Sequence, residues 1–225
     1  MLPKLSTRAI RSCSHGRLSV SHSPMILSSW LAYAQCRFCT ILPMPAYAYA
    51  ILTAGWLFWM TPFLLIKRNR AAGAKLDRRA RWGVLLEALA YWMLWWGNFW
   101  TRSPQPWRVA ISIIFFLLAG FLSWTSARAL GRQWRIDAGL NPDHQLVRSG
   151  AYRVVRHPIY TSMFCMLLGT GLMITPFPLF LLSILLFIVG TEIRVRIEDA
   201  LLASRFGDQF RDYKRTVSAY IPFVK

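Results

Sequence analysis

Long apolar runs in this sequence constrain its fold more than any other feature. The first covers residues 45–66 and is almost wholly apolar. Because an α-helix rises about 1.5 Å per residue, about 20 apolar residues are enough to cross a hydrocarbon core about 30 Å thick. Further apolar runs follow at residues 82–100, 107–127, 159–174 and 177–191. Thr175-Pro176 separates the last two runs, and its proline favours a tight break, so these runs are expected to form a helical hairpin. The pattern predicts an all-α, polytopic membrane protein with about five transmembrane helices.

The basic residues between these runs predict an orientation. Residues 67–81 hold seven basic residues and one acid, and residues 128–158 hold six arginines and two acids. Residues 194–225 hold seven basic and four acidic residues and are amphipathic. Since cytoplasmic loops carry an excess of Lys and Arg, these three segments are expected on the cytoplasmic side. Anionic headgroups, rather than nucleic acid, then explain the formal net charge of +18.

Residues 1–43 are a distinct amino-terminal extension. They hold several basic residues, many serines and no acid, which is typical of a targeting peptide. The alternative is an over-extended gene start, with Met44 opening the protein. If residues 24–42 also cross the membrane, the number of spans becomes six and the amino terminus lies inside. No chemistry is assigned to this region.

Glu87 lies inside the apolar run 82–100, where a carboxylate is a functional suspect. The plainer explanation is that it reaches the interface or pairs with a basic neighbour such as Arg81.

The cysteines do not indicate a metal site. Cys36 and Cys39 form a C-x-x-C pair, but no second pair or histidine cluster is present to complete the ligand set. The sequence predicts no metal centre.

Polar groups gather at residues 146–160, where a new apolar run begins. Pro158 is suited to the first position of a helix, since its fixed φ fits there and its missing N–H has no partner at that position. The free N–H groups and positive dipole end of such a helix can hold a carboxylate or phosphate. Arg153, Arg156 and His157 would reinforce that site. The alternative is that these side chains only anchor the chain to lipid phosphates.

A second polar group follows the last apolar run, at residues 192–199. On a helix, Arg194 shares a face with Glu198, and Glu192 shares a face with Arg196. These pairs are explained either as intrahelical ion pairs or as a site for a ligand that carries both a cation and an anion.

The order of these motifs resembles the isoprenylcysteine carboxyl methyltransferase family over about residues 143–223, a family related to the phospholipid methyltransferases. The motifs that carry the resemblance are Tyr152-Arg153, Arg156-His157-Pro158-Ile159-Tyr160, Glu198-Asp199-Ala200-Leu201-Leu202, Phe206-Gly207, Tyr213-Lys214 and Tyr220-Ile221-Pro222-Phe223.

The resemblance implies a multi-helix membrane enzyme with a cytoplasmic-side cofactor pocket, which transfers a methyl group from S-adenosylmethionine to the carboxylate of a lipophilic or prenylated acceptor. Residues 128–225 would form the methyltransferase region, after three transmembrane helices within 44–127. Arg194 falls on a position that contacts the substrate carboxylate. The implied cofactor-binding positions are His144, Gln145, Leu146, Val147, Tyr152, His157, Pro158, Ile159, Tyr160 and Glu198.

Four other functions stay open from the sequence. An ethanolamine phospholipid or a small thiol is an alternative methyl acceptor. Sterol reductases that use NADPH have a similar arginine-histidine-tyrosine region, but they usually carry Asn-Tyr where this chain has Pro158-Ile159-Tyr160. A membrane scaffold is the non-enzymatic alternative. The oligomeric state and the host membrane are also open.

Overall fold

The computed structural model describes residues 44–66, 78–96, 103–131 and 145–220, and the backbone alone of residues 75–76 and 139–140. The alternatives for residues 1–43, the question of a sixth span and the Cys36–Cys39 pair all lie outside the described residues. The described chain is built almost entirely of helices, which confirms the all-α prediction.

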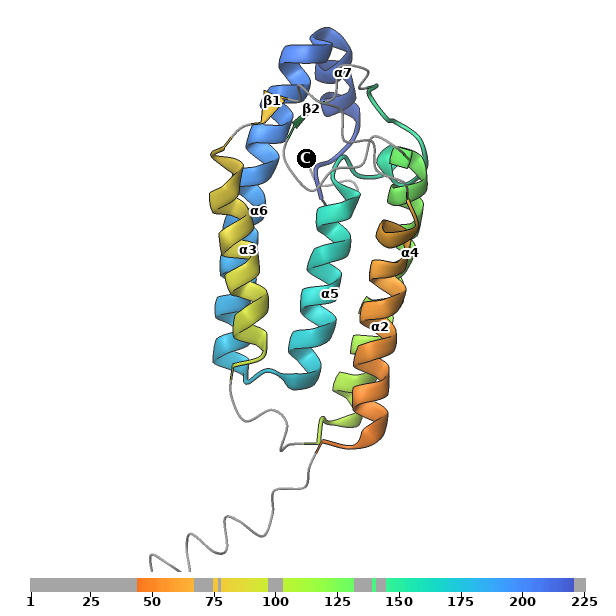
Figure 1. Ribbon diagram of the computed structural model, residues 1–225, viewed down its shortest axis with the longest axis vertical. Helices are drawn as coiled ribbons and strands as arrows, with labels where there is room; N and C mark the ends of the chain where they lie inside the picture. Colours follow the sequence, from red (N-terminus) through yellow and green to blue (C-terminus); the bar gives the residue numbers. More distant parts are fainter. Residues whose placement is uncertain are drawn as a thin grey trace, which may run out of the picture. The chain divides into compact units, whose positions relative to one another are not determined.

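The principal helices are α2 Ala46–Leu65, α3 Ala80–Leu94, α4 Pro106–Leu130, α5 Pro158–Ile174, α6 Phe177–Phe206 and α7 Asp208–Thr216. Figure 1 shows α3 beside α6, with α5 between that pair and α2 with α4. A short 3-10 helix, η3 Gly150–Arg153, precedes α5. The two-residue strands β1 Lys75–Leu76 and β2 Gly139–Leu140 pair antiparallel.

Three helices, α2, α4 and α6, are long and apolar enough to cross a membrane. Helices α3 and α5 have 15 and 17 residues and are shorter than a full span. The structure therefore supports a polytopic membrane protein, while the count of five spans stays a prediction. Outward-facing side chains such as Leu64, Ile114 and Leu185 are mostly exposed, as expected for surfaces that face lipid.

Prolines and glycines set the helix boundaries. Pro158 opens α5, as the sequence predicts, and Pro106 opens α4. The break predicted at Thr175-Pro176 is present, since α5 ends at Ile174 and α6 begins at Phe177. Helix α6 continues well past the apolar run that ends at residue 191, because no Gly or Pro interrupts it before Gly207. Gly207 adopts a φ of 53°, a conformation that favours glycine and ends helices. Helix α6 thus has an apolar first half, residues 177–191, and a polar second half, residues 192–206.

Helices α3 and α6 approach closely through a pair of glycines. A Cβ atom on Gly83 would lie 2.5 Å from the carbonyl oxygen of Gly190, and one on Gly190 would lie 2.8 Å from the carbonyl oxygen of Gly83. Small residues allow such backbone contact between membrane helices. Glu87 follows Gly83 by one helical turn in α3, and Arg194 follows Gly190 by one turn in α6. The two side chains form a hydrogen-bonded ion pair at this contact.

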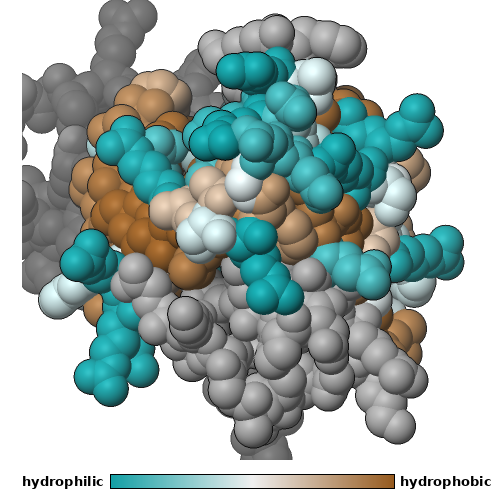
Figure 2. Space-filling model, turned by 90° about the horizontal axis from the view of Figure 1, so that it is seen from above, coloured by the Kyte–Doolittle hydropathy of each residue, from teal (hydrophilic) through white to brown (hydrophobic). Residues whose placement is uncertain are grey.

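Buried polar side chains connect the remaining helices. The indole N–H of Trp59 in α2 donates to the hydroxyl of Ser162 in α5 over 3.0 Å. The hydroxyl of Ser123 in α4 donates to the carbonyl of Trp59 over 2.7 Å. Interhelical hydrogen bonds of this kind hold membrane helices together where the hydrophobic effect between them is weak. At one end of the helices, over α7, hydrophilic residues gather (Figure 2).

We expect Gly190→Leu to destabilise the protein by about 1–3 kcal/mol, the usual cost of overpacking, because the added side chain has no space against α3. The measurement is the melting temperature of the purified protein in detergent. Val189→Leu is the matched control, since Val189 is 52% exposed and an added methylene meets no neighbouring helix. Equal melting temperatures for the two variants would contradict the close contact.

Candidate ligand-binding site at the polar end of the helices

The sequence-predicted site residues come from three neighbouring elements. Tyr152 lies in η3 and is buried, and His157 is the residue that caps the start of α5. Arg194 and Glu198 lie one turn apart in the polar half of α6. Gln145, Leu146 and Val147 lie before η3 without regular secondary structure, and Leu146 and Val147 are half-buried. His144 lies outside the described residues.

The structure brings Tyr160, Arg194 and Glu198 together, and we call them with Glu87 and Thr191 the Arg194 cluster. The guanidinium carbon of Arg194 lies 4.9 Å from the centre of the Tyr160 ring. The Tyr160 hydroxyl donates a hydrogen bond to Glu198 Oε1. Arg194 Nη2 lies 4.0 Å from the same oxygen, beyond hydrogen-bond distance. A cation, an anion and an aromatic face are thus grouped in one place.

Glu87 in α3 belongs to this cluster, although the sequence did not identify it as a site residue. Its side chain is almost fully buried, and its carboxylate accepts hydrogen bonds from Arg194 Nη1 over 2.8 Å and from the Thr191 hydroxyl over 3.0 Å. The expectation of a basic partner is met, but by a residue 107 positions away rather than by a neighbour in sequence. The available signal was the placement of an ionisable residue inside an apolar run.

Asp199 is the centre of a second group, which we call the Asp199 junction. Its Oδ2 accepts hydrogen bonds from Arg156 Nη1 over 2.7 Å and from Lys214 Nζ over 3.0 Å. Its Oδ1 lies 3.0 Å from His157 Nε2. Burial raises the pKa of Asp199, but the hydrogen bonds from His157, Arg156 and Lys214 outweigh it and hold the pKa far below its usual range. Sequence reasoning missed this residue as a structural centre.

Residues 213–219, near the end of the described chain, form hydrogen bonds with the segment that leads into α5. The backbone N–H groups of Arg156 and His157 donate to the carbonyls of Ser218 and Ala219 over 2.8 and 3.0 Å. The Tyr213 hydroxyl donates to the carbonyl of Tyr152 over 2.5 Å. Burial raises the pKa of Tyr213 to about 12, so this donor stays protonated at physiological pH. Residues 152–157 are therefore positioned by a segment about 60 residues later.

His157 connects the two groups. While its Nε2 faces Asp199, its Nδ1 lies 3.7 Å from Glu198 Oε2. The sequence suggested that Arg156 and His157 reinforce an anion site at the start of α5. In the structure Arg156 is engaged by Asp199 and by the carbonyl of Val217, and the His157 ring lies between two carboxylates. The side chain left partly open at this point is Glu198, which is 25% exposed.

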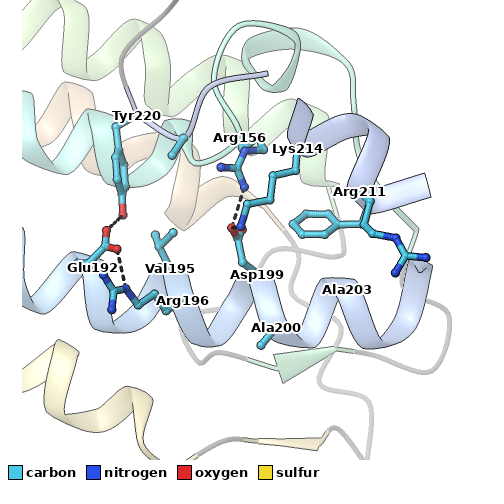
Figure 3. Close-up of a pocket in the computed structure, with 12 residues that line it drawn as sticks. Arg156, Glu192, Val195, Arg196, Asp199, Ala200, Ala203, Arg211, Lys214 and Tyr220 are labelled. Atoms are coloured by element: carbon cyan, nitrogen blue, oxygen red, sulfur yellow. Dashed lines mark hydrogen bonds and ion pairs between the residues drawn. The ribbon is translucent and has the colours of Figure 1, made fainter. Parts of the chain in front are cut away.

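A cavity of about 540 Å³ lies beside the Asp199 junction, on another face of α6 (Figure 3). Its α6 lining is Glu192, Val195, Arg196, Asp199, Ala200 and Ala203. With 3.6 residues per turn, these positions face away from Arg194 and Glu198. Figure 3 shows Asp199 directed toward Arg156 and Lys214, and Glu192 between Tyr220 and Arg196. None of the predicted cofactor residues that the structure describes lines this cavity.

The second pair predicted along α6 is also present, since Arg196 Nε lies 2.7 Å from Glu192 Oε1. Within the described part of the chain, no group of three or more His, Cys, Asp and Glu side chains is placed to hold a metal ion.

Comparisons with known proteins support the resemblance found in the sequence. Residues 107–209, which include α5, α6 and all of α4 except its first residue, match the phospholipid methyltransferase family. The protein-S-isoprenylcysteine O-methyltransferase of Schizosaccharomyces pombe is 38% identical over 84 residues, 37% of this chain and 36% of that protein. The Tribolium castaneum protein of the same name is 31% identical over 124 residues, 53% of this chain and 43% of that protein.

A bacterial relative carries a different name. The nickel-cobalt-cadmium resistance protein NccN of Alcaligenes xylosoxydans xylosoxydans is 28% identical over 134 residues, 52% of this chain and 62% of that protein. In all three relatives the match spans less than two thirds of the relative's own length. The predicted resemblance to the isoprenylcysteine carboxyl methyltransferases is confirmed, and the matched region contains every site residue predicted from it.

We expect Asp199→Asn to destabilise the protein by about 3 kcal/mol, the lower end for a broken buried ion pair, because Arg156 and Lys214 lose their shared carboxylate. Melting temperature in detergent measures the effect. Asp208→Asn is the matched control, since Asp208 pairs with Arg211 at an exposed position where such pairs contribute about 0–1 kcal/mol. A similar loss in both variants would contradict a structural role for the junction.

The same carboxylate gives a pH dependence of known sign. Because the pKa of Asp199 is lower in the folded protein than the unfolded value of about 3.9, its contribution is complete above that value and is lost as the pH falls below it. Between pH 6 and pH 3, the wild-type melting temperature should therefore fall more than that of Asp199→Asn. Parallel curves for the two proteins would show that Asp199 is not the group responsible.

Proposed function

We propose that this chain is a membrane-embedded, S-adenosylmethionine-dependent methyltransferase that acts on the carboxylate of a lipophilic acceptor. The observation that carries the proposal is the Arg194 cluster, which groups Arg194, Glu198 and Tyr160 at the polar end of apolar helices. Its support comes from the match to the phospholipid methyltransferase family and from relatives that are named isoprenylcysteine O-methyltransferases.

The residues present fit S-adenosylmethionine by the chemistry of their side chains. The partly exposed Glu198 carboxylate, which accepts a hydrogen bond from Tyr160, suits a cationic centre. The first turn of α5, which opens at Pro158, suits the carboxylate of the ligand. Tyr152, His157, Ile159 and the segment 144–147 complete the proposed pocket. When bound, the cofactor supplies a methyl group activated by the adjacent sulfonium.

In this proposal the residues of the chain bind the cofactor and orient the acceptor carboxylate. A carboxylate acceptor is ionised at neutral pH, since such groups have pKa values of about 3 to 4, so no general base is required. Arg194 orients the acceptor carboxylate, and the position of the site beside apolar helices favours a lipophilic acceptor. Catalysis would then depend mainly on alignment of the reacting groups. The site faces the cytoplasm if the basic segments lie there.

Cofactor binding tests the site. In purified protein in detergent, Glu198→Gln should raise the dissociation constant of S-adenosylmethionine at least tenfold, because the carboxylate charge that faces the cationic ligand is lost. Isothermal titration calorimetry measures it. The control is Glu192→Gln, which removes a carboxylate of the same helix from the face that lines the other cavity. Unchanged affinity in Glu198→Gln would contradict the assignment.

Methyl transfer from labelled cofactor tests the acceptor, with a panel of a prenylcysteine, an ethanolamine phospholipid and a small thiol. The expected product is the prenylcysteine methyl ester. Arg194→Gln should raise KM for the prenylcysteine more than tenfold, because the acceptor carboxylate loses its cationic partner. Label on the ethanolamine lipid or the thiol instead would replace the carboxylate acceptor. No transfer, combined with NADPH binding, would favour a reductase.

A further inference from the structure

Glu87 takes no part in the proposed function as stated above, yet its carboxylate is the one that holds Arg194. It is buried in α3, outside residues 107–209, which match the phospholipid methyltransferase family. A buried carboxylate in an apolar helix is costly unless it is paired, and this one has both a cationic and a hydroxyl partner. The contact with Glu87 therefore fixes the position of the Arg194 guanidinium.

The close approach of α3 and α6 decides which way Arg194 points. A Cβ atom on Gly83 would lie 2.5 Å from Arg194 Cγ, so the stem of the arginine side chain runs directly over that glycine. The stem leads the guanidinium to Glu87, where Nη1 is held at 2.8 Å. Larger side chains at position 83 would displace the arginine.

Arg194 lies near two carboxylates at unequal distances. Glu87 Oε2 is at 2.8 Å from Nη1, whereas Glu198 Oε1 is at 4.0 Å from Nη2. Arg194 and Glu198 are also four residues apart on one helix, a spacing at which ion pairs form readily. Without the Glu87 charge, a small rotation of the arginine side chain would bring it into contact with Glu198. That contact would neutralise the carboxylate that the proposed site offers to a cation.

We propose that Glu87 is a positioning residue that holds Arg194 away from Glu198, so that the Glu198 carboxylate stays available to the cationic part of S-adenosylmethionine. The inference rests on the proposed function, because it concerns the same cofactor. It adds that affinity for the cofactor depends on a residue in α3, which touches neither cofactor nor acceptor.

The alternative is that the ion pair only joins α3 to α6. The two readings differ in what they predict for cofactor affinity. If Glu87 merely supports the fold, folded protein that lacks it binds S-adenosylmethionine normally. If Glu87 keeps Arg194 from Glu198, its loss weakens binding even in folded protein, and the additional loss of Arg194 restores it.

The test uses the full chain in nanodiscs and measures the dissociation constant of S-adenosylmethionine by calorimetry. Glu87→Gln should raise it about tenfold. The double variant Glu87→Gln with Arg194→Gln should return to within about twofold of wild type, because no arginine is left to pair with Glu198. Turnover of the carboxylate acceptor should stay low in the double variant, since Arg194 is absent.

Two controls separate charge from folding. Glu87→Asp keeps the negative charge and should bind cofactor within about threefold of wild type. Ser123→Ala removes a buried hydrogen bond between α4 and α2 that lies outside the Arg194 cluster, so it should lower the melting temperature without changing cofactor affinity. Wild-type affinity in folded Glu87→Gln would overturn this inference and leave the proposed function standing. Failure of the wild-type protein to bind S-adenosylmethionine would overturn both.

Discussion

The ion pair between Glu87 and Arg194 is the interaction on which the arrangement of the polar site depends. Both side chains are buried, and removal of water from two charges costs several kcal/mol per ion unless close partners compensate. The compensation is possible because Gly83 and Gly190 let the backbones of α3 and α6 touch. Packing and electrostatics are coupled here, since the same glycines that allow the helices to approach also bring the charges together.

Helix α6 contributes residues to both polar groups, from two different faces. One face carries Arg194 and Glu198, which meet Glu87 and Tyr160. Another face carries Asp199, which binds Arg156, His157 and Lys214 and so attaches the end of the described chain. Because His157 lies between Glu198 and Asp199, the anchoring of the chain end and the geometry of the proposed cofactor site are linked through one imidazole ring. A change at the Asp199 junction can therefore reach the Arg194 cluster without touching it.

The region that matches the phospholipid methyltransferase family stops short of the full cluster. Residues 107–209 include Tyr160, Arg194 and Glu198, but Glu87 lies before them, in α3. Motifs that identify the site therefore leave out the carboxylate that orients its arginine. The Schizosaccharomyces pombe and Tribolium castaneum relatives match this chain over less than half of their own length. Within the family match at residues 107–209 lie Tyr160, Arg194 and Glu198, whereas Glu87, which is proposed to position Arg194, lies outside it.

The sequence by itself determined the features that depend on local interactions. Apolar runs predicted the helices, Pro158 and Thr175-Pro176 marked boundaries that the structure confirms, and the spacing of Glu192 with Arg196 predicted an ion pair that is present. Only the tertiary structure decided the partners of Glu87 and Asp199, because those contacts join segments many residues apart. The continuation of α6 to Phe206 was also not predicted. The apolar run ends at residue 191, but the backbone hydrogen bonds of the helix continue until Gly207. Spacing along a chain encodes a helix face, but which two faces meet depends on how closely their backbones can approach.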